Sequence, residues 1–316
     1  DGVSASPFPP LQPAARAPAR PTAYPVLMLW RDIAARIGEA TGRGFAAQPP
    51  HIVGGGCINS AFRLTDGDLS WFVKTNSSEL LDMFEAEGLN ALLRGDAIRA
   101  PRALLTGVSN GTAFIVMEHF ELGHGSSMGW RRAGRELVEL HRNSANAFGW
   151  HRANTIGATP QHNGWQQDWT TFWREKRLGF QLDLAARNGH RGRLQSMGAQ
   201  LLARFPVLID HNPTPSLLHG DLWGGNIGFT RAGDPVLYDP ATYYGDREAE
   251  LAMTELFGGF SADFYSSYRE AWPIDPGYRV RKTLYNLYHV LNHLNLFGGG
   301  YGTQAERRLG RLLAEC

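Results

Sequence analysis

The sequence predicts an α+β fold of two lobes, in which a small lobe with an antiparallel sheet is followed by a larger helical lobe. Two observations favour this fold. Short strand-like runs separated by turn signals are concentrated between residues 51 and 119, and most segments after residue 126 repeat apolar residues at helical spacing. With 316 residues, of which 43% are hydrophobic and 19% charged, the chain is also long and apolar enough to bury such cores.

Residues 1–25 predict a flexible arm, and residues 26–120 predict the small N-lobe. The arm holds seven prolines and six alanines without apolar periodicity, whereas 26–42 has the apolar spacing of a helix. A second helix is expected over 78–94. The expected strands of this lobe are short and end at turn signals, and they are 51–53, 61–65, 71–75, 103–106 and 113–119.

Residues 121–316 predict a helical C-lobe that contains one hairpin. The hairpin joins 226–230 to 235–239 around a turn at 231–234. A small strand-rich lobe followed by a large helical lobe is a protein-kinase-like layout, although a layout alone is weak evidence for function. The expected helices are 127–146, 165–188, 191–205, 246–257, 261–271, 277–297 and 303–314.

Composition and charge argue against several classes of protein. Lys+Arg is 31 and Asp+Glu is 30, and a net charge of +1 gives no support for a nucleic-acid-binding protein. No stretch reads as a span of about 20 apolar residues, so no membrane partner is expected. Two cysteines cannot form a disulfide framework, which favours a reducing, cytoplasmic location. Only three of the 31 basic residues are lysines, so each lysine merits attention.

The strongest chemical motif places Asp221 and Asn226 on one loop and Asp239 after the hairpin. Pairing Thr230 with Pro235 would put Asn226 opposite Asp239 at the open end of the hairpin. Amide and carboxylate oxygens suit Mg²⁺. An Asp five residues before an Asn, with a later Asp, is the spacing of a phosphoryl-transfer loop in which the first Asp accepts the hydroxyl proton. The motif therefore predicts a base and two Mg²⁺ ligands.

Three glycines, Gly54, Gly55 and Gly56, lie between two expected strands and could let backbone N–H groups approach a phosphate. A glycine-rich hairpin turn is common, so this signal is weak by itself. Cys57 follows directly. It is either a small residue tolerated in a turn or a redox-sensitive thiol. In the second case, oxidation of the thiol could inactivate the protein reversibly, and a disulfide between two copies of Cys57 could even link two subunits into a homodimer.

Lys74 is expected to be buried, because strand alternation puts it on the same face as Phe72. A buried lysine needs an acidic partner. Glu85 and Glu87 on the following helix are the candidates, and Glu87 is favoured because it lies at the edge of the apolar stripe of the helix.

The apolar run 113–120 could join the two lobes and offer the backbone of Glu118, His119 and Phe120 to an adenine edge, although by itself it also reads as a core strand. Later in the chain, Asp246 is expected to cap a helix, and Glu250 could brace the catalytic loop as a structural residue.

His289 and His293 are four residues apart on the expected helix 277–297, a spacing that two metal ligands can have. No third ligand is suggested. They are interpreted as polar groups of the core or of a substrate pocket.

Several longer runs resemble the fructosamine kinase, or ketosamine 3-kinase, family, which is similar to the aminoglycoside phosphotransferases. The resemblance covers about residues 26–316 and is most specific in its last three runs. The runs are 54–59, 72–76, 83–87, 218–226, 239–248, 253–260 and 285–300.

This resemblance implies an ATP-dependent kinase acting on the 3-hydroxyl of ketosamines, which are sugar adducts of small amines or of proteins. The 3-phosphate product is unstable and releases the free amine, so the activity is protein deglycation. Trp223 would lie against the sugar, with packing as the alternative. The other implied roles are base (Asp221), Mg²⁺ ligands (Asn226, Asp239), phosphate positioning (Lys74, Glu87) and adenine contact (118–120).

Two other functions share parts of this pattern. An aminoglycoside-phosphotransferase-like kinase for a different small hydroxyl substrate would have the same loop, but an aminoglycoside pocket should be acidic and helix 277–297 is rich in aromatic, Asn and His residues. A non-catalytic ATP-binding scaffold should have lost part of the motif, which is complete here. Ribulosamines and fructosamines both remain candidate substrates.

Overall fold

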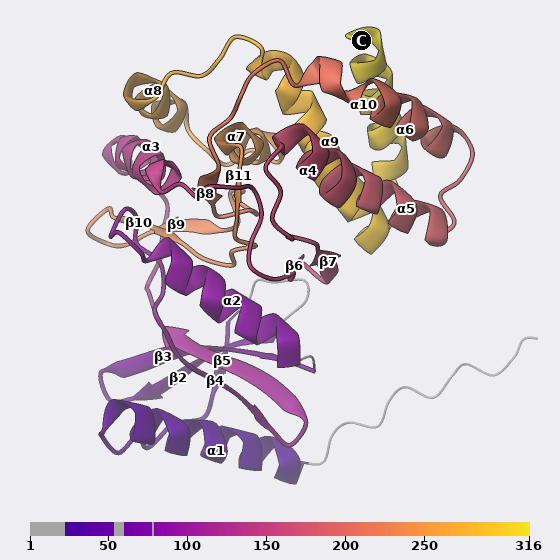
Figure 1. The fold of residues 1–316 in the computed structure, drawn as a ribbon. Helices are drawn as coiled ribbons and strands as arrows, with labels where there is room; N and C mark the ends of the chain where they lie inside the picture. Colours follow the sequence, from indigo (N-terminus) through magenta and orange to yellow (C-terminus); the bar gives the residue numbers. More distant parts are fainter. Residues whose placement is uncertain (1–22, 54–59, 78) are drawn as a thin grey trace, which may run out of the picture.

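The computed structural model describes residues 23–53, 60–77 and 79–316, and it has the two-lobed α+β architecture that the sequence predicts (Figure 1). Gly54, Gly55, Gly56 and Cys57 lie outside the described residues, as does most of the expected arm. Within the described part of the chain, no helix is both long and apolar enough to cross a bilayer.

The N-lobe is an antiparallel five-stranded sheet in the order β1-β2-β3-β5-β4, with α1 (Ala23–Thr41) and α2 (Glu79–Leu92) on opposite faces (Figure 1). Side chains alternate along each strand, so Val73 packs toward α1 whereas Phe72 packs with the α2 side. Lys74 therefore lies on the α2 side. The strands are β1 (His51–Ile52), β2 (Ser60–Asp66), β3 (Leu69–Asn76), β4 (Ala103–Ser109) and β5 (Thr112–Glu118).

The C-lobe is helical and carries three two-stranded sheets, of which only β9–β10 was expected. One pairs β6 (Asn154–Ile156) with β7 (Thr159–Gln161), and another pairs β8 (Ser216–Leu218) with β11 (Tyr243–Gly245). The main helices are α3 (Ser127–Arg142), α4 (Trp169–Trp173), α5 (Phe180–Arg187), α6 (Arg193–Arg204), α7 (Arg247–Leu256), α8 (Ala262–Ala271), α9 (Tyr278–Phe297) and α10 (Tyr301–Ala314).

The single helix expected over 165–188 is wrong in one respect. A π-helical segment, η1 (Arg174–Gly179), separates α4 from α5. Its Arg177 is fully buried, with the guanidinium 4.3 Å from the ring centre of Tyr243 and hydrogen-bonded to Asn163 Oδ1 at 2.7 Å. These are tertiary contacts, which apolar spacing along the chain does not report.

The expected pairing of Thr230 with Pro235 is wrong by one residue. In the hairpin of β9 (Ile227–Phe229) and β10 (Pro235–Leu237), Pro235 pairs with Phe229. Thr230 N donates to Asp234 O at 2.9 Å, which leaves a three-residue loop. Gly233 has a φ of 86° and supplies the left-handed residue that three-residue hairpin loops use.

Candidate active site

The loop that carries Asp221 begins where β8 ends, and a buried carboxylate holds its backbone. Glu250 on α7 accepts hydrogen bonds from Gly220 N at 2.7 Å, from His219 N at 3.2 Å and from His141 Nε2 at 2.8 Å. Burial alone would raise the pKa of Glu250, but these donors outweigh it and the pKa lies below its ordinary value. His141 had no expected role, because it lies about 80 residues before the loop in sequence and belongs to no motif.

Two residues, His219 and Gly220, determine the backbone conformation of the loop just before Asp221. Gly220 has a φ of 85°, and a Cβ there would lie 2.1 Å from Ala241 O, so only glycine fits. Burial lowers the pKa of His219 and favours the neutral ring. Its Nε2 lies 2.9 Å from Tyr238 O, and its Nδ1 accepts from Asp221 N at 3.3 Å. His219 thus fixes the backbone at Asp221.

The structure brings Asp221, Asn226 and Asp239 together. Asn226 Nδ2 donates to Asp221 O at 2.8 Å and to its Oδ2 at 3.3 Å. Because of the shifted register Asn226 lies opposite Tyr238, and Asp239 is the next residue. Asp239 has a φ of 60°, a strained conformation that asparagine and aspartate tolerate best and that is typical of functional sites.

Asn226 and Asp239 offer oxygen ligands that fit Mg²⁺, and the ionisation of Asp221 depends on the charge beside it. Burial raises the pKa of Asp221 to about 7, and the nearby charge of Asp239 adds to the effect. Since Asn226 Nδ2 donates to Asp221, its Oδ1 is the atom that can ligate a cation. A divalent cation held by Asn226 and Asp239 would relieve the repulsion that Asp221 experiences.

Lys74 completes the site from the N-lobe. The prediction that Glu87 is its acidic partner is wrong, because the partner on α2 is Glu85. Lys74 Nζ is 2.8 Å from Glu85 Oε1 and also contacts Asp239, whereas Glu87 accepts a hydrogen bond from Trp150. Two residues along a helix differ by about 200° in direction, so Glu85 faces the sheet when Glu87 faces the C-lobe. Burial alone would lower the pKa of Lys74, but the two carboxylates outweigh it and the pKa is raised.

The segment expected to contact adenine leads out of β5 toward the C-lobe. Glu118 N donates to Arg102 O at 3.0 Å, and the Glu118 carboxylate accepts from Arg102 N at 3.1 Å. His119 Nδ1 lies 3.0 Å from Ser70 Oγ, and Phe120 follows, partly exposed. Because the Glu118 N–H is engaged with Arg102, a base bound here would need its backbone N–H donor from the residues that follow Glu118.

A row of aromatic rings lies beside the catalytic loop. Trp223, two residues after Asp221, is 39% exposed, and its ring centre is 6.2 Å from that of Phe257, which is 4.8 Å from that of His293. His289 is buried instead, and burial lowers its pKa to about 3. Phe257 had no expected role, because an apolar residue at a helix end gives no local signal of a site.

A second group of acids and histidine lies at the start of α7. His211, Asp246 and Glu248 offer ligand atoms within 4.8 Å of one another. Arg281 Nε donates to Glu248 at 2.7 Å, and Tyr285 Oη donates to Asp246 at 2.6 Å. Donors on α9 thus already occupy both carboxylates, so the cluster braces α7 against α9.

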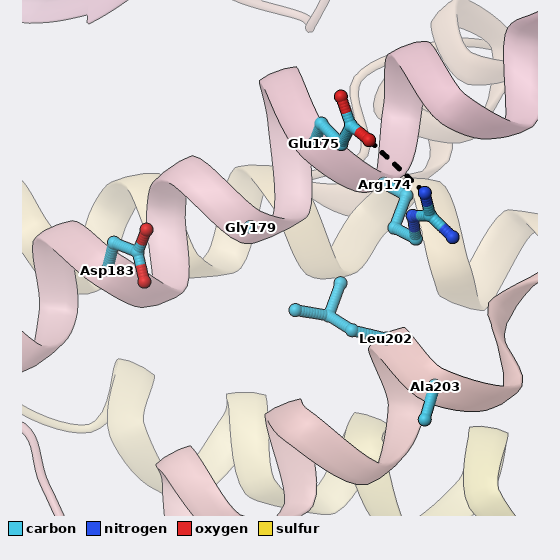
Figure 2. Close-up of a pocket in the computed structure, with 6 residues that line it drawn as sticks. All are labelled: Arg174, Glu175, Gly179, Asp183, Leu202 and Ala203. Carbon is cyan, nitrogen blue, oxygen red and sulfur yellow. Dashed lines mark hydrogen bonds and ion pairs between the residues drawn. The ribbon is translucent and has the colours of Figure 1, made fainter.

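A hollow of about 520 Å³ lies between η1, α5 and α6 (Figure 2). Its lining residues are Arg174, Glu175, Gly179, Asp183, Leu202 and Ala203, and none of them belongs to the catalytic loop or the N-lobe. It is therefore separate from the site described above. The redox and homodimer hypotheses for Cys57 stay predictions, because that residue lies outside the described ones.

Comparison with known proteins identifies the family. A family model for fructosamine kinase matches residues 29–315. A probable ketoamine kinase from Synechocystis is 48% identical over 287 residues, which is 90% of this chain and 97% of the relative. The chloroplastic protein-ribulosamine 3-kinase of Oryza sativa subsp. japonica is 44% identical over 260 residues, which is 80% of this chain and 75% of the relative.

Solved structures agree with this assignment. A proposed fructosamine-3-kinase from Haemophilus somnus superposes with a TM-score of 0.83 at 27% identity, covering 92% of this chain and 99% of that one. An aminoglycoside phosphotransferase has a TM-score of 0.61 at 15% identity, covering 89% and 98%, and so shares the fold. The resemblance noted in the sequence is confirmed, and the chain belongs to the fructosamine kinase family.

Proposed function

We propose that the protein is an ATP-dependent kinase that phosphorylates the 3-hydroxyl of ketosamines. The observation that carries the proposal is the meeting of Lys74, Asp221, Asn226 and Asp239 between the two lobes. Phosphoryl transfer needs the three kinds of group that these residues provide. Lys74 is the cation for the phosphates, Asn226 and Asp239 are the metal ligands, and Asp221 is the residue that orients the hydroxyl. The names of the relatives, ketoamine kinase and protein-ribulosamine 3-kinase, support the substrate class.

In this reaction Asp221 accepts the proton of the attacking 3-hydroxyl. Its pKa of about 7 suits a base that works near neutral pH, since a catalytic base is most effective when its pKa is close to the operating pH. Lys74, held by Glu85, positions the phosphates of ATP. Asn226 and Asp239 would hold Mg²⁺, which supplies charge neutralisation at the transferred phosphate.

The sugar of the substrate lies against Trp223 in this proposal, with Phe257 and His293 extending the same wall. An exposed aromatic face can stack on a sugar ring while leaving the amine end outside. Both small-molecule ketosamines and glycated proteins are therefore candidate substrates. β-Elimination of phosphate from the enolised 3-phosphate product would leave an imine at C1, and hydrolysis of this imine by water would free the amine, which amounts to deglycation.

The test is a coupled assay of ATP turnover with ribulose-, erythrulose- and fructose-amine adducts, each offered on a small amine and on a protein. We expect ADP release that depends on the adduct and a phosphate ester at C3 by ³¹P NMR. The Asp221→Asn variant should bind ATP but lose most turnover. Equal ADP release with the unmodified amine, or none with any adduct although ATP binds, would rule out the proposed function.

A further inference from the structure

We propose that Glu87 is a positioning residue that clamps α2 to the C-lobe in the arrangement that phosphoryl transfer needs, an inference that rests on the proposed function. Its Oε1 accepts a hydrogen bond from Trp150 Nε1 at 2.7 Å and lies 2.8 Å from His151 Nε2. Its Oε2 forms an ion pair with Arg152. One carboxylate of the N-lobe thus meets three consecutive residues of the C-lobe. The Glu87 side chain is 22% exposed, and its partners are 6% (Trp150), 57% (His151) and 37% (Arg152) exposed, so the hydrogen bond to Trp150 is the buried part of this contact.

The N-lobe end of the clamp controls the phosphate-binding lysine. Two residues before Glu87, Glu85 holds Lys74 at 2.8 Å, and Lys74 in turn contacts Asp239. One residue after it, Gly88 packs so closely on the C-lobe that a Cβ would lie 2.8 Å from Pro240 Cγ. Two independent contacts therefore fix one turn of α2 against the C-lobe. In Figure 1, α2 lies on the face of the sheet that is turned toward the C-lobe.

The C-lobe end of the clamp leads to the catalytic base. The Trp150 ring stacks on Tyr244 with centres 5.5 Å apart, and Gly149 exchanges two backbone hydrogen bonds of 2.8 Å with Tyr244. Tyr244 lies on β11 and pairs with Leu217 on β8, the strand that runs into the loop of Asp221. The clamp therefore connects α2 through packed strands to the catalytic loop.

This arrangement predicts that the loss of Glu87 lowers the rate of phosphoryl transfer. When Glu87 is removed, α2 loses its carboxylate contacts to the C-lobe. The packing of Gly88 on Pro240 and the contact of Lys74 with Asp239 are then left to set the position of Lys74 relative to Asp221. A displacement of about 1 Å in a reacting arrangement can cost as much as 10²-fold in rate. We expect Glu87→Ala to lower kcat about 10- to 100-fold. The KM for the ketosamine should change less than about twofold, because Glu87 contacts Trp150, His151 and Arg152 and not the ring wall at Trp223.

The conservative variants separate positioning from folding. Glu87→Gln keeps an acceptor for Trp150 but loses the charge opposite Arg152, so its kcat should fall between those of the parent and Glu87→Ala. Trp150→Phe keeps the stacking but removes the donor. Its effect should be smaller in the Glu87→Ala background than in the parent, because residues that act through one contact are not additive. The control is Glu139→Gln, which removes an exposed pair with Arg142 within α3 and should keep kcat within twofold.

The experiment measures steady-state kinetics together with hydrogen exchange of the full chain. In Glu87→Ala we expect faster exchange in α2 peptides and unchanged exchange in α9 and α10 peptides. Unchanged α2 exchange, or a kcat within twofold of the parent, would overturn the clamp. If Glu87→Ala does not fold, kcat and the hydrogen exchange of α2 peptides are measured on Glu87→Gln instead, and the same outcomes support or overturn the clamp. A parent without ketosamine kinase activity would refute the proposed function instead, and exchange in α2 would still test the clamp.

Discussion

Replacing Asp221 with asparagine should make the folded protein more stable at pH 8 even though it removes most phosphoryl transfer. Burial, followed by the charge of Asp239, raises the pKa of the Asp221 carboxyl from 3.8 to about 7. The folded state then binds a proton more tightly than the unfolded state between these two values. The free energy of unfolding therefore falls as pH rises through this window, and asparagine has no such loss.

The size of the effect follows from the shift. A change from 3.8 to about 7 corresponds to about 4 kcal/mol at 1.36 kcal/mol per unit. Asp221 keeps some contact with solvent, which screens the penalty, so we expect a gain of roughly 1–2 kcal/mol at pH 8. The gain should shrink toward pH 5, where the carboxyl in the folded parent is already mostly protonated.

The measurement is urea unfolding of the parent and Asp221→Asn at pH 5 and pH 8, without nucleotide and with a chelator so that no cation offsets the repulsion. In a separate assay of the parent with Mg²⁺, kcat/KM should fall as the pH is lowered, because the base must be deprotonated. A variant that is less stable than the parent at pH 8, or a gain that is the same at both pH values, would refute the reasoning.

Three further substitutions test other parts of the site. Asp239→Ala should weaken Mg²⁺-dependent ATP binding at least tenfold, about 1.4 kcal/mol by calorimetry, and unchanged affinity would remove Asp239 from the metal site. Trp223→Ala should raise the KM for the ketosamine far more than that for ATP, whereas a loss of stability with unaltered kinetics would favour packing. Gly220→Ala should cost at least about 2 kcal/mol in urea unfolding and most of kcat, because its Cβ would lie 2.1 Å from Ala241 O; parent-like unfolding would contradict the close approach.

Local signals in the sequence were sufficient for the two-lobed layout and for the prediction that Asp221, Asn226 and Asp239 lie together. Alternation along 71–75 placed Lys74 on the same side as Phe72, and the structure agrees, since strand periodicity depends only on the backbone. The spacing of Asp221, Asn226 and Asp239 likewise follows from one loop and one hairpin. The helical C-lobe was predictable because its helices repeat apolar residues at a regular spacing.

The tertiary structure decided which side chains of these elements meet. Whether Lys74 pairs with Glu85 or Glu87 depends on the rotation of α2 about its axis, and the close packing of Gly88 on Pro240 is one of the contacts that accompany the observed rotation. Glu250 holds the catalytic loop by accepting hydrogen bonds from His141 and from the loop backbone at Gly220. These three residues lie far apart in the sequence. Periodicity fixes the faces of an element but not the neighbour that each face meets, because that choice depends on packing between distant segments.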